Sequence, residues 1–448
     1  MTSWSSLLRQ RSFTYLLISG SASLAAPTGS LILVSWALAH AYPASAPTSY
    51  PAIALALLGL SSTIPTLVAA LISGTLADRQ DRRALMRSVN LLAFAATLAI
   101  AAILLVRPEQ PLALPGGSGA YLPLWVVLLY PLWALETAAI TVFRPAFNAS
   151  VPRVVERADL GSANGLIYAV ALLLSIGASL SASGLASFVS WGEALAVPLA
   201  LFAVTQVSLQ LLEADLAPRR EGPVRRFLSD ASEGYRYLWQ RRDLFEITVA
   251  ALAVNFFSAV AFVELGLYAT FWLQASDPIL LGALVAAGSL GAAVGGLVVS
   301  RFAFHLRAGK LLIVFTVGQG LAVLALGLLR SVWLAIPDMF LFGLFPGMTT
   351  TVFLATVQAT VPDEKLGRVL AADEVGSYAL VPFGQWAGGV LTVASSIQAT
   401  YVSAGIGTVG VGGLMATMRD IRHLRFTTRA EAPRTEEPPV PATEPVVP

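Results

Sequence analysis

The sequence places two acidic side chains, Glu136 and Glu264, inside long apolar stretches. An ionisable group at membrane depth must be offset by a partner, by water or by protonation. Burial in apolar surroundings favours the neutral form of a carboxyl group, so either residue could carry a proton near neutral pH. We therefore predict that both bind protons and face an aqueous cavity. The alternative is that they hydrogen-bond neighbouring helices or lie closer to an interface.

A further set of residues is predicted to line or gate the same cavity. Arg144 follows Glu136 by eight residues, on roughly the same helix face but about 12 Å away along the axis. We expect Arg144 to be a gate or anchor at the cytoplasmic end of its helix. The other cavity or gate candidates are Asn255, Phe256, Gln358 and Gln385. For the aromatic side chain, packing or lipid contact is the alternative.

The composition argues against metal, thiol and nucleotide chemistry. Cysteine is absent, and the histidines His40, His305 and His423 lie far apart along the chain. We therefore expect no metal site and no cofactor. The sequence has no G-x-x-x-x-G-K-[ST] loop, so ATP is not expected to be the direct energy source. A net charge of +2 gives no basis for nucleic-acid binding.

These residues lie on a chain that fits a bilayer better than water. Of 448 residues 56% are hydrophobic and 12% charged, with a mean hydropathy of +0.73, whereas soluble domains are about a quarter charged. A helix needs roughly 20 apolar residues to cross the hydrocarbon core. Such runs predict an all-α membrane protein with twelve spans, at 13–39, 51–76, 84–106, 121–146, 163–187, 193–212, 244–273, 278–302, 310–329, 332–358, 368–394 and 397–418.

The basic residues gather on one side of these predicted spans. With the N-terminus inside, only Arg107 and Arg330 of the 28 basic residues fall outside. Positive charge is retained on the cytoplasmic side, so both termini are predicted to be cytoplasmic. The chain is expected to reside in the cell membrane (inner or plasma membrane) as a multi-pass protein, most simply a monomer in the lipid bilayer.

Polar segments divide the chain into four predicted parts. Residues 1–212 form an N-terminal six-helix bundle, 213–243 a cytoplasmic linker, 244–418 a C-terminal six-helix bundle, and 419–448 a disordered cytoplasmic tail. Within the linker, apolar residues recur at helical spacing with arginines on the other faces, which is typical of an amphipathic helix on the membrane surface. A disordered linker is the alternative.

A short repeat suggests that the two bundles are related. Val151-Pro152 follows the fourth predicted span and Val361-Pro362 follows the tenth, 210 residues later. Two six-helix halves related by an axis along the membrane normal are typical of one large class of transporters.

The loop between the second and third spans, GTLADRQDRR, carries the most specific motif. It resembles the signature loop of the major facilitator superfamily, G-x-x-x-D-R-x-G-R-R. The matching positions are Gly74, Asp78, Arg79, Arg82 and Arg83. The resemblance implies the major facilitator fold and a gating role for this loop, which in the family latches the two halves together. Asp81 stands where the family has glycine.

Three further phrases resemble the drug- and siderophore-exporting branch of that superfamily, which includes enterobactin and macrolide exporters. They are LLRQRSFTYLLISGSASL, RPAFNASVP and VPDEKLGR. The fifth span, SIGASLSASG, lacks the proline that such exporters often carry there.

The resemblance implies a secondary active transporter that works by alternating access. We expect proton-coupled export of a hydrophobic or amphipathic small molecule, such as a drug, siderophore or metabolite. An importer or a lysophospholipid flippase of the same fold is the alternative. A non-transporting membrane enzyme or sensor is a remote one, because cysteine is absent and no histidine lies at mid-bilayer.

Overall fold

The computed structural model describes residues 4–42, 47, 49–107, 111–113, 121–156, 159–216, 227–302 and 307–424. Long helices dominate these ranges because a helix satisfies its own backbone polar groups where no water is available. In the described part of the chain, eleven helices are long and apolar enough to cross a membrane. Their bounds lie close to the predicted runs, as in Arg82–Val106 against 84–106.

The elements follow one another in this order. The first half of the chain forms α1 (Trp4–Leu8), α2 (Arg11–Ala39), α3 (Ser49–Arg79), α4 (Arg82–Val106), β1 (Pro111–Ala113), β2 (Tyr121–Pro123), α5 (Leu124–Val154), α6 (Leu160–Leu185), α7 (Trp191–Ala194) and α8 (Ala196–Leu211). The second half forms α9 (Phe227–Gln240), α10 (Arg242–Val263), α11 (Leu265–Leu267), η2 (Tyr268–Trp272), α12 (Pro278–Phe302), α13 (Ala308–Leu328), α14 (Val332–Thr360), α15 (Asp363–Tyr378), α16 (Val381–Ala394), α17 (Ile397–Thr417) and α18 (Arg419–His423). The strands β1 and β2 pair antiparallel as a hairpin.

Two predicted spans in the second half are interrupted. In the seventh, Glu264 separates α10 from α11, and the π-helical turn η2 follows. In the eleventh, α15 and α16 have 16 and 14 residues, so neither is long enough to cross the membrane alone. Pro382 lies at the start of α16; it has no backbone N–H and so favours the end of the preceding helix. Together α15 and α16 occupy the predicted span 368–394.

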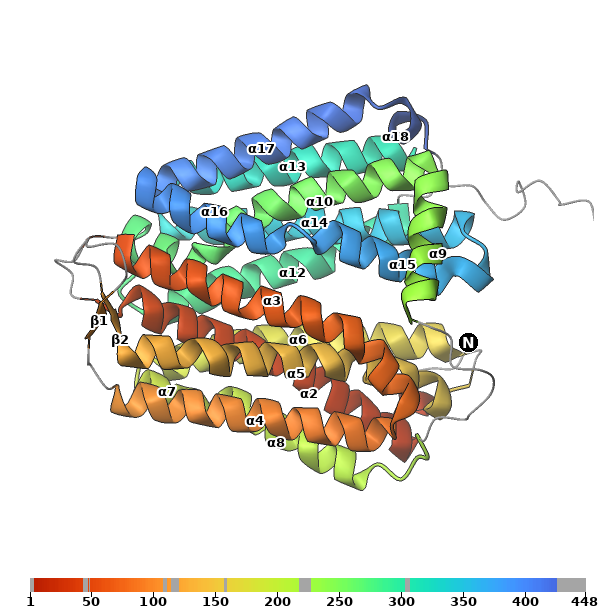
Figure 1. Ribbon diagram of the computed structural model, residues 1–448, viewed down its shortest axis with the longest axis horizontal. Coiled ribbons are helices and arrows are strands. Elements are labelled where there is room, and N and C mark those ends of the chain that lie inside the picture. The colour runs from red at the N-terminus through yellow and green to blue at the C-terminus, as the bar shows by residue number, and fades with distance from the viewer. Residues whose placement is uncertain are drawn as a thin grey trace, which may run out of the picture.

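Figure 1 shows two stacked groups of nearly parallel helices. We call the group α2–α8 the N-terminal half and the group α10–α17 the C-terminal half. The β1–β2 hairpin lies at one end of the bundle, and α9 lies across the opposite end. These are called the hairpin end and the α9 end; the charge distribution predicts that the α9 end is cytoplasmic.

The two halves contact each other next to the hairpin end. There, the largest cluster of buried apolar side chains combines residues of both halves, for example Leu58 of α3 with Leu265 of α11. The helices approach closely because glycine stands at the seam. A Cβ added to Gly282 of α12 would lie 2.8 Å from the backbone oxygen of Ser179 of α6.

Two side-chain hydrogen bonds also join the halves in this region. Thr63 Oγ1 of α3 donates to Gln385 Oε1 of α16 at 2.6 Å. The Ser187 hydroxyl, which follows α6, donates to the Asp277 carboxylate, which precedes α12. This end of the bundle is therefore closed.

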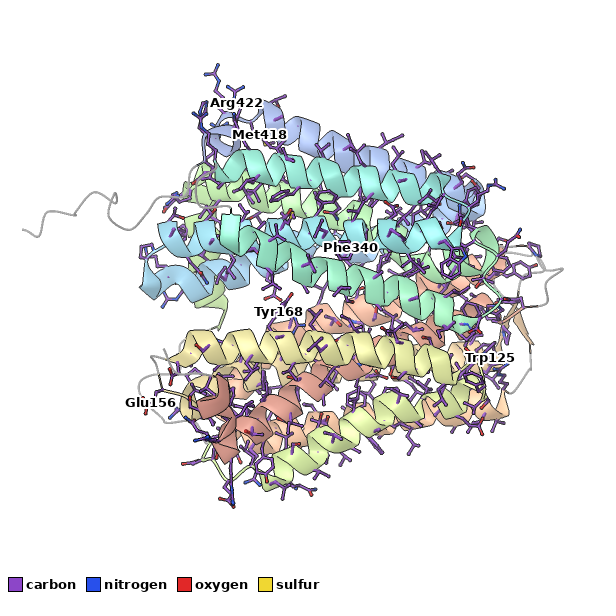
Figure 2. All side chains as sticks on the ribbon, turned by 180° about the vertical axis from the view of Figure 1, so that it is seen from behind. Trp125, Glu156, Tyr168, Phe340, Met418 and Arg422 are labelled. Atoms are coloured by element: carbon purple, nitrogen blue, oxygen red, sulfur yellow. The ribbon has the colours of Figure 1, made fainter. Side chains whose placement is uncertain are left out.

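The halves are separate at the α9 end. Here one buried cluster consists of N-terminal residues, and two others consist of C-terminal residues. Arg144 of α5 is exposed although it lies within a spanning helix, and a charged side chain at that depth must contact water. Tyr168 of α6 is 63% exposed and lies at the edge of its half that faces the other half (Figure 2). The bundle is therefore open between its halves at the α9 end.

Candidate functional site

Glu136 lies on α5 and is fully enclosed by the N-terminal half, with 0% of its surface exposed. Its Oε2 accepts a 2.8 Å hydrogen bond from Thr97 of α4. The Ser30 side chain of α2 lies beside it. Oε1 is buried without a hydrogen-bond partner. The site thus offers one carboxyl oxygen that is held in place and one that is free to carry a proton.

Glu264 lies at the break between α10 and α11 and is also 0% exposed. Both of its carboxyl oxygens are buried without a hydrogen-bond partner. Thr392 of α16 lies beside it, and the Thr392 hydroxyl shares a 2.9 Å hydrogen bond with Thr400 of α17. An unpartnered buried carboxylate is costly. This position is therefore suited to a group that gains and loses a proton during a functional cycle.

The enclosure of both carboxyl groups differs from what the sequence indicated. We predicted that Glu136 and Glu264 face an aqueous cavity between the halves. In this conformation each is packed inside its own half and neither reaches the open space. The reason is that their contacts come from helices distant in sequence, Thr97 in one case and Thr392 in the other.

A third acidic residue in the C-terminal half was not singled out as a candidate by the sequence. Asp338 lies seven residues into α14, near the end of a span, yet it is only 8% exposed and its Oδ2 has no hydrogen-bond partner. Tyr268 and Tyr401 lie nearby with their rings 4.7 Å apart, and both hydroxyls are buried and unpartnered. In the sequence, the only feature that points to Asp338 is its position as an acidic residue within an apolar run.

The predicted cavity and gate residues fall into two groups. Arg144 and Gln358 are exposed, and Arg144 lies near enough to the C-terminal half for its charge to act on the Tyr378 hydroxyl. Asn255 and Gln385 instead hold helices together.

Asn255 makes its contact within the C-terminal half, and Gln385 makes its contact between the two halves. Asn255 Nδ2 donates to the Ser377 backbone oxygen at 3.0 Å, and Gln385 accepts the bond from Thr63 across the interface. Phe256 is partly buried against the shared core, its ring edge-on to Phe257.

The loop between α3 and α4 fastens α4 to its neighbours. Asp81 caps α4 by accepting a 3.0 Å hydrogen bond from the Arg83 backbone N–H. Arg82 donates to the Ala149 oxygen of α5 at 2.9 Å. Arg83 donates to two carbonyl oxygens at the end of α8 at 2.8 and 2.6 Å. Gly74, Asp78 and Arg79 lie in the last turns of α3, and the side chains of Asp78 and Arg79 are outside the described part of the chain.

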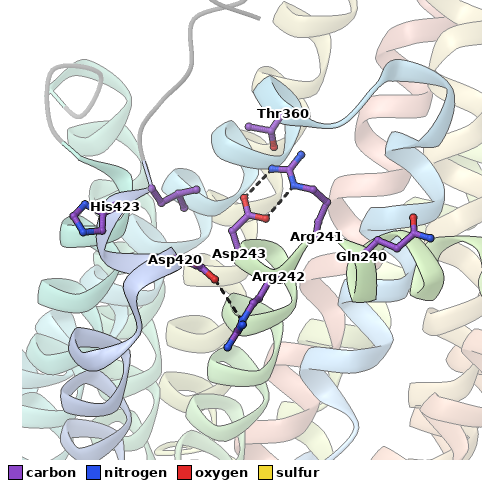
Figure 3. Close-up of a pocket in the computed structure, with 8 residues that line it drawn as sticks. Gln240, Arg241, Arg242, Asp243, Thr360, Asp420 and His423 are labelled. Carbon is purple, nitrogen blue, oxygen red and sulfur yellow. Dashed lines mark hydrogen bonds and ion pairs between the residues drawn. The ribbon is translucent and has the colours of Figure 1, made fainter. Parts of the chain in front are cut away.

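A surface cavity of about 540 Å³ lies at the α9 end, where α9, α10 and α18 meet (Figure 3). Arg241 forms a two-point ion pair with Asp243 at 3.0 and 2.8 Å, and these hydrogen bonds raise the pKa of Arg241. Arg242 pairs with Glu246 at 3.2 Å and with Asp420 at 3.5 Å. Both arginines are therefore engaged in ion pairs, of which Arg242–Asp420 joins α10 to α18. The residues that line the cavity belong to α9, α10, α14 and α18 and their ends, so it is separate from the space between the halves.

Comparison with known proteins adds sequence relationships to this geometry. The profile of a family described as transmembrane secretion effector, of the major facilitator type, matches residues 1–443. The enterobactin exporter of Escherichia coli (strain K12) is 27% identical over 391 residues, which cover 82% of this chain and 85% of the exporter. The multidrug efflux pump Tap of Mycolicibacterium fortuitum is 24% identical over 388 residues, which cover 83% and 89%.

Solved transporter structures share the fold. A nucleoside transporter superposes with a TM-score of 0.71 at 11% identity, covering 91% of this chain and 100% of that chain. A D-xylose–proton symporter superposes with a TM-score of 0.67 at 14% identity, covering 95% and 100%. The predicted major facilitator fold is therefore confirmed by structures of distant sequence.

Proposed function

The chain belongs to the transmembrane secretion effector family of the major facilitator superfamily, and we propose that it exports a hydrophobic or amphipathic small molecule in exchange for protons. It is a multi-pass membrane transporter, not an enzyme, as its relatives and its fold both indicate. The relatives whose names state a cargo export enterobactin or multiple drugs. The finer mechanism rests on the arrangement of this chain's own residues.

The observation that carries the proposal is the unequal contact between the two halves. They share one buried core next to the hairpin end and have separate cores at the α9 end. In alternating access, a cargo site between two halves opens to one side at a time. The conformation described here corresponds to the state open at the α9 end, where a cargo would enter from the predicted cytoplasm.

Glu136 and Glu264 are the proposed carriers of the coupled proton. Each is fully buried, and between them three of the four carboxyl oxygens lack a partner. A group of this kind can be neutral in one conformation and charged in another when its surroundings change. One such carboxyl lies in each half, so relative movement of the halves alters access to both.

Gating is assigned to the loop between α3 and α4 and to Arg144. Arg82 and Arg83 already join α4 to α5 and α8, and Gly74, Asp78 and Arg79 complete the family motif on α3. We assign the motif residues the role of a latch that holds the α9 end closed in the opposite conformation.

Arg144 lies opposite the C-terminal half. Its charge acts on Tyr378 of α15, as does that of Glu374. When the halves approach at the α9 end, Arg144 would meet this acidic segment.

The cargo would bind in the space between the halves, in contact with side chains such as Phe256 and Gln358. Asn255 and Gln385 would set the shape of this space through their helix-to-helix hydrogen bonds. An apolar site with few polar groups suits a hydrophobic or amphipathic molecule. A single copy of the chain contains both halves, so we propose that the monomer is the working unit.

The proposal is tested with the purified protein in liposomes, using ethidium and enterobactin as probes. An imposed pH gradient should drive accumulation of at least one probe, and a protonophore should abolish it. The variants E136Q and E264Q should retain downhill movement of the probe but lose the pH-driven part. The proposed coupling would be contradicted if the protonophore did not reduce accumulation, or if pH-driven transport persisted in both variants. Movement of the probe only in the inward direction would indicate an importer.

A further inference from the structure

The C-terminal half contains a group of four buried side chains with oxygen atoms that make no hydrogen bonds in the folded protein. Glu264 and Tyr268 are 0% exposed, Tyr401 is 1% exposed and Asp338 is 8% exposed. Both Glu264 oxygens, both tyrosine hydroxyls and Asp338 Oδ2 have no hydrogen-bond partner. Buried polar atoms are usually satisfied. Five unpartnered oxygens on four neighbouring residues therefore call for an explanation other than stability.

These residues come from four segments and are arranged as a series. Asp338 of α14 lies within electrostatic range of Tyr268 of η2. The Tyr268 and Tyr401 rings are 4.7 Å apart at an angle of 37°. Tyr401 of α17 in turn lies within electrostatic range of Glu264. Thr392 of α16 also lies beside Glu264 and is hydrogen-bonded to Thr400.

All four residues lie in the part of the bundle next to the hairpin end, where Tyr268 and Tyr401 are each four residues from the end of η2 or the start of α17. Asp338 is the least buried of the four and lies about 9 Å along α14 from its first residue at that end. Glu264 lies deeper, at the joint between α10 and α11. The π-helical turn η2 begins at Tyr268, and such turns are frequent at functional sites because they redirect side chains within a helix.

We propose that Asp338, Tyr268 and Tyr401 form a proton-transfer chain that supplies Glu264 from the hairpin end. In the conformation described here the chain is interrupted, because none of these oxygens is hydrogen-bonded to another. Opening of the hairpin end would connect them. This inference rests on the proposed proton coupling and adds to it a route, a direction and three residues.

Connection of the chain allows one proton to pass without charging either phenol. The Asp338 carboxyl gives its proton to the Tyr268 oxygen while the proton of Tyr268 moves to the Tyr401 oxygen. The former Tyr401 proton moves to the Glu264 carboxylate. Asp338 is left ionised and regains a proton from water at the hairpin end, so the net result is one proton delivered to Glu264.

The interruption also explains why the chain would not leak protons. A proton path that stayed open to the hairpin end while the cavity is open at the α9 end would dissipate the gradient. Because the hydroxyls are unpartnered in this conformation, Glu264 is disconnected from the hairpin end while the bundle is open at the α9 end.

The test compares Y268F and Y401F with wild type in liposomes, with ethidium as the probe. Each variant removes one hydroxyl and little volume. Accumulation of ethidium driven by a pH gradient should fall by about tenfold or more, the scale of a lost proton-transfer group. Downhill ethidium efflux without a gradient should change by less than about twofold, since cargo contacts are intact. D338N should behave like the tyrosine variants, and D338E should recover part of the activity.

The matched control is Y130F in the N-terminal half. The Tyr130 hydroxyl donates to the Ala54 backbone oxygen at 3.1 Å, so this variant loses a structural hydrogen bond and should keep pH-driven accumulation. Y268F and Y401F lose no hydrogen bond, so their thermal stability should be unchanged or higher.

If Y268F and Y401F both accumulate ethidium as well as wild type does under a pH gradient, the proton-transfer chain is rejected, while proton coupling itself still stands. If wild type itself shows no pH-driven accumulation, the proposed function fails and the chain with it. If a sodium gradient drives accumulation in place of the pH gradient, the five oxygens would be assigned to sodium binding and the proton chain rejected.

Discussion

Replacing Gly282 by valine should shift the transporter away from the conformation described here. Gly282 of α12 meets α6 at the closed hairpin end. A Cβ at this position would lie 2.7 Å from the Ser183 Cβ and 2.8 Å from the Ser179 backbone oxygen. A contact with backbone cannot be relieved by a side-chain rotation, so the two helices must separate. The strain exists only while the hairpin end is closed.

The size of the shift follows from the cost of overpacking. Extra methyl groups in a tightly packed seam cost about 1–3 kcal/mol. Because this cost applies to one of the two conformations, the ratio of open to closed hairpin ends should rise by roughly 5- to 150-fold. A protein that is almost fully closed at this end would become a measurable mixture.

The assay uses the absence of cysteine from the native chain. Single cysteines at Phe188 and Trp333, which are 88% and 80% exposed near the hairpin end, can carry spin labels without further substitutions. The label-to-label distance should acquire a longer component in G282V. The control is G177V on α6, where an added Cβ meets nothing within 4 Å. Equal distance distributions in G282V and wild type, or the same change in G177V, would refute this reasoning.

Three other predictions concern the N-terminal half. E136Q keeps the size of the side chain and the bond from Thr97 but cannot bind a proton as a carboxylate, so the pH dependence of ethidium transport should flatten; an unchanged pH profile would exclude Glu136 as a carrier. R83L loses two hydrogen bonds to carbonyl oxygens of α8, and thermal unfolding in detergent should show a loss of about 1–3 kcal/mol. R144A should leave that stability within about 0.5 kcal/mol, because the side chain is exposed, while slowing ethidium transport; a stability loss equal to that of R83L would show that Arg144 is a structural anchor instead.

The helices could be predicted from the sequence because a membrane span is a local property. A run of about 20 apolar residues forms a helix that satisfies its backbone hydrogen bonds internally, independently of the neighbouring helices. The prediction 397–418 therefore lies within a residue of Ile397–Thr417. The interruption at Glu264 was missed, since a helix break without proline leaves little trace in hydrophobicity.

The surroundings of the functional residues could not be predicted in the same way. Whether Glu136 faces water or the inside of its half depends on Thr97, on another helix. The sequence shows that Asp338 lies near the end of a span, but not that its side chain is buried. The effect of Asp81 in the motif was equally unpredictable; it serves as a helix cap that a glycine would provide less well.

The most direct test of alternating access measures both ends of the same bundle. A second label pair at Glu156 and Arg422, which lie at the α9 end on opposite halves (Figure 2), reports on that end, while Phe188 and Trp333 report on the hairpin end. Under a change of pH or on addition of ethidium, one distance should lengthen as the other shortens. Distances that change together, or a change at one end alone, would contradict alternating access.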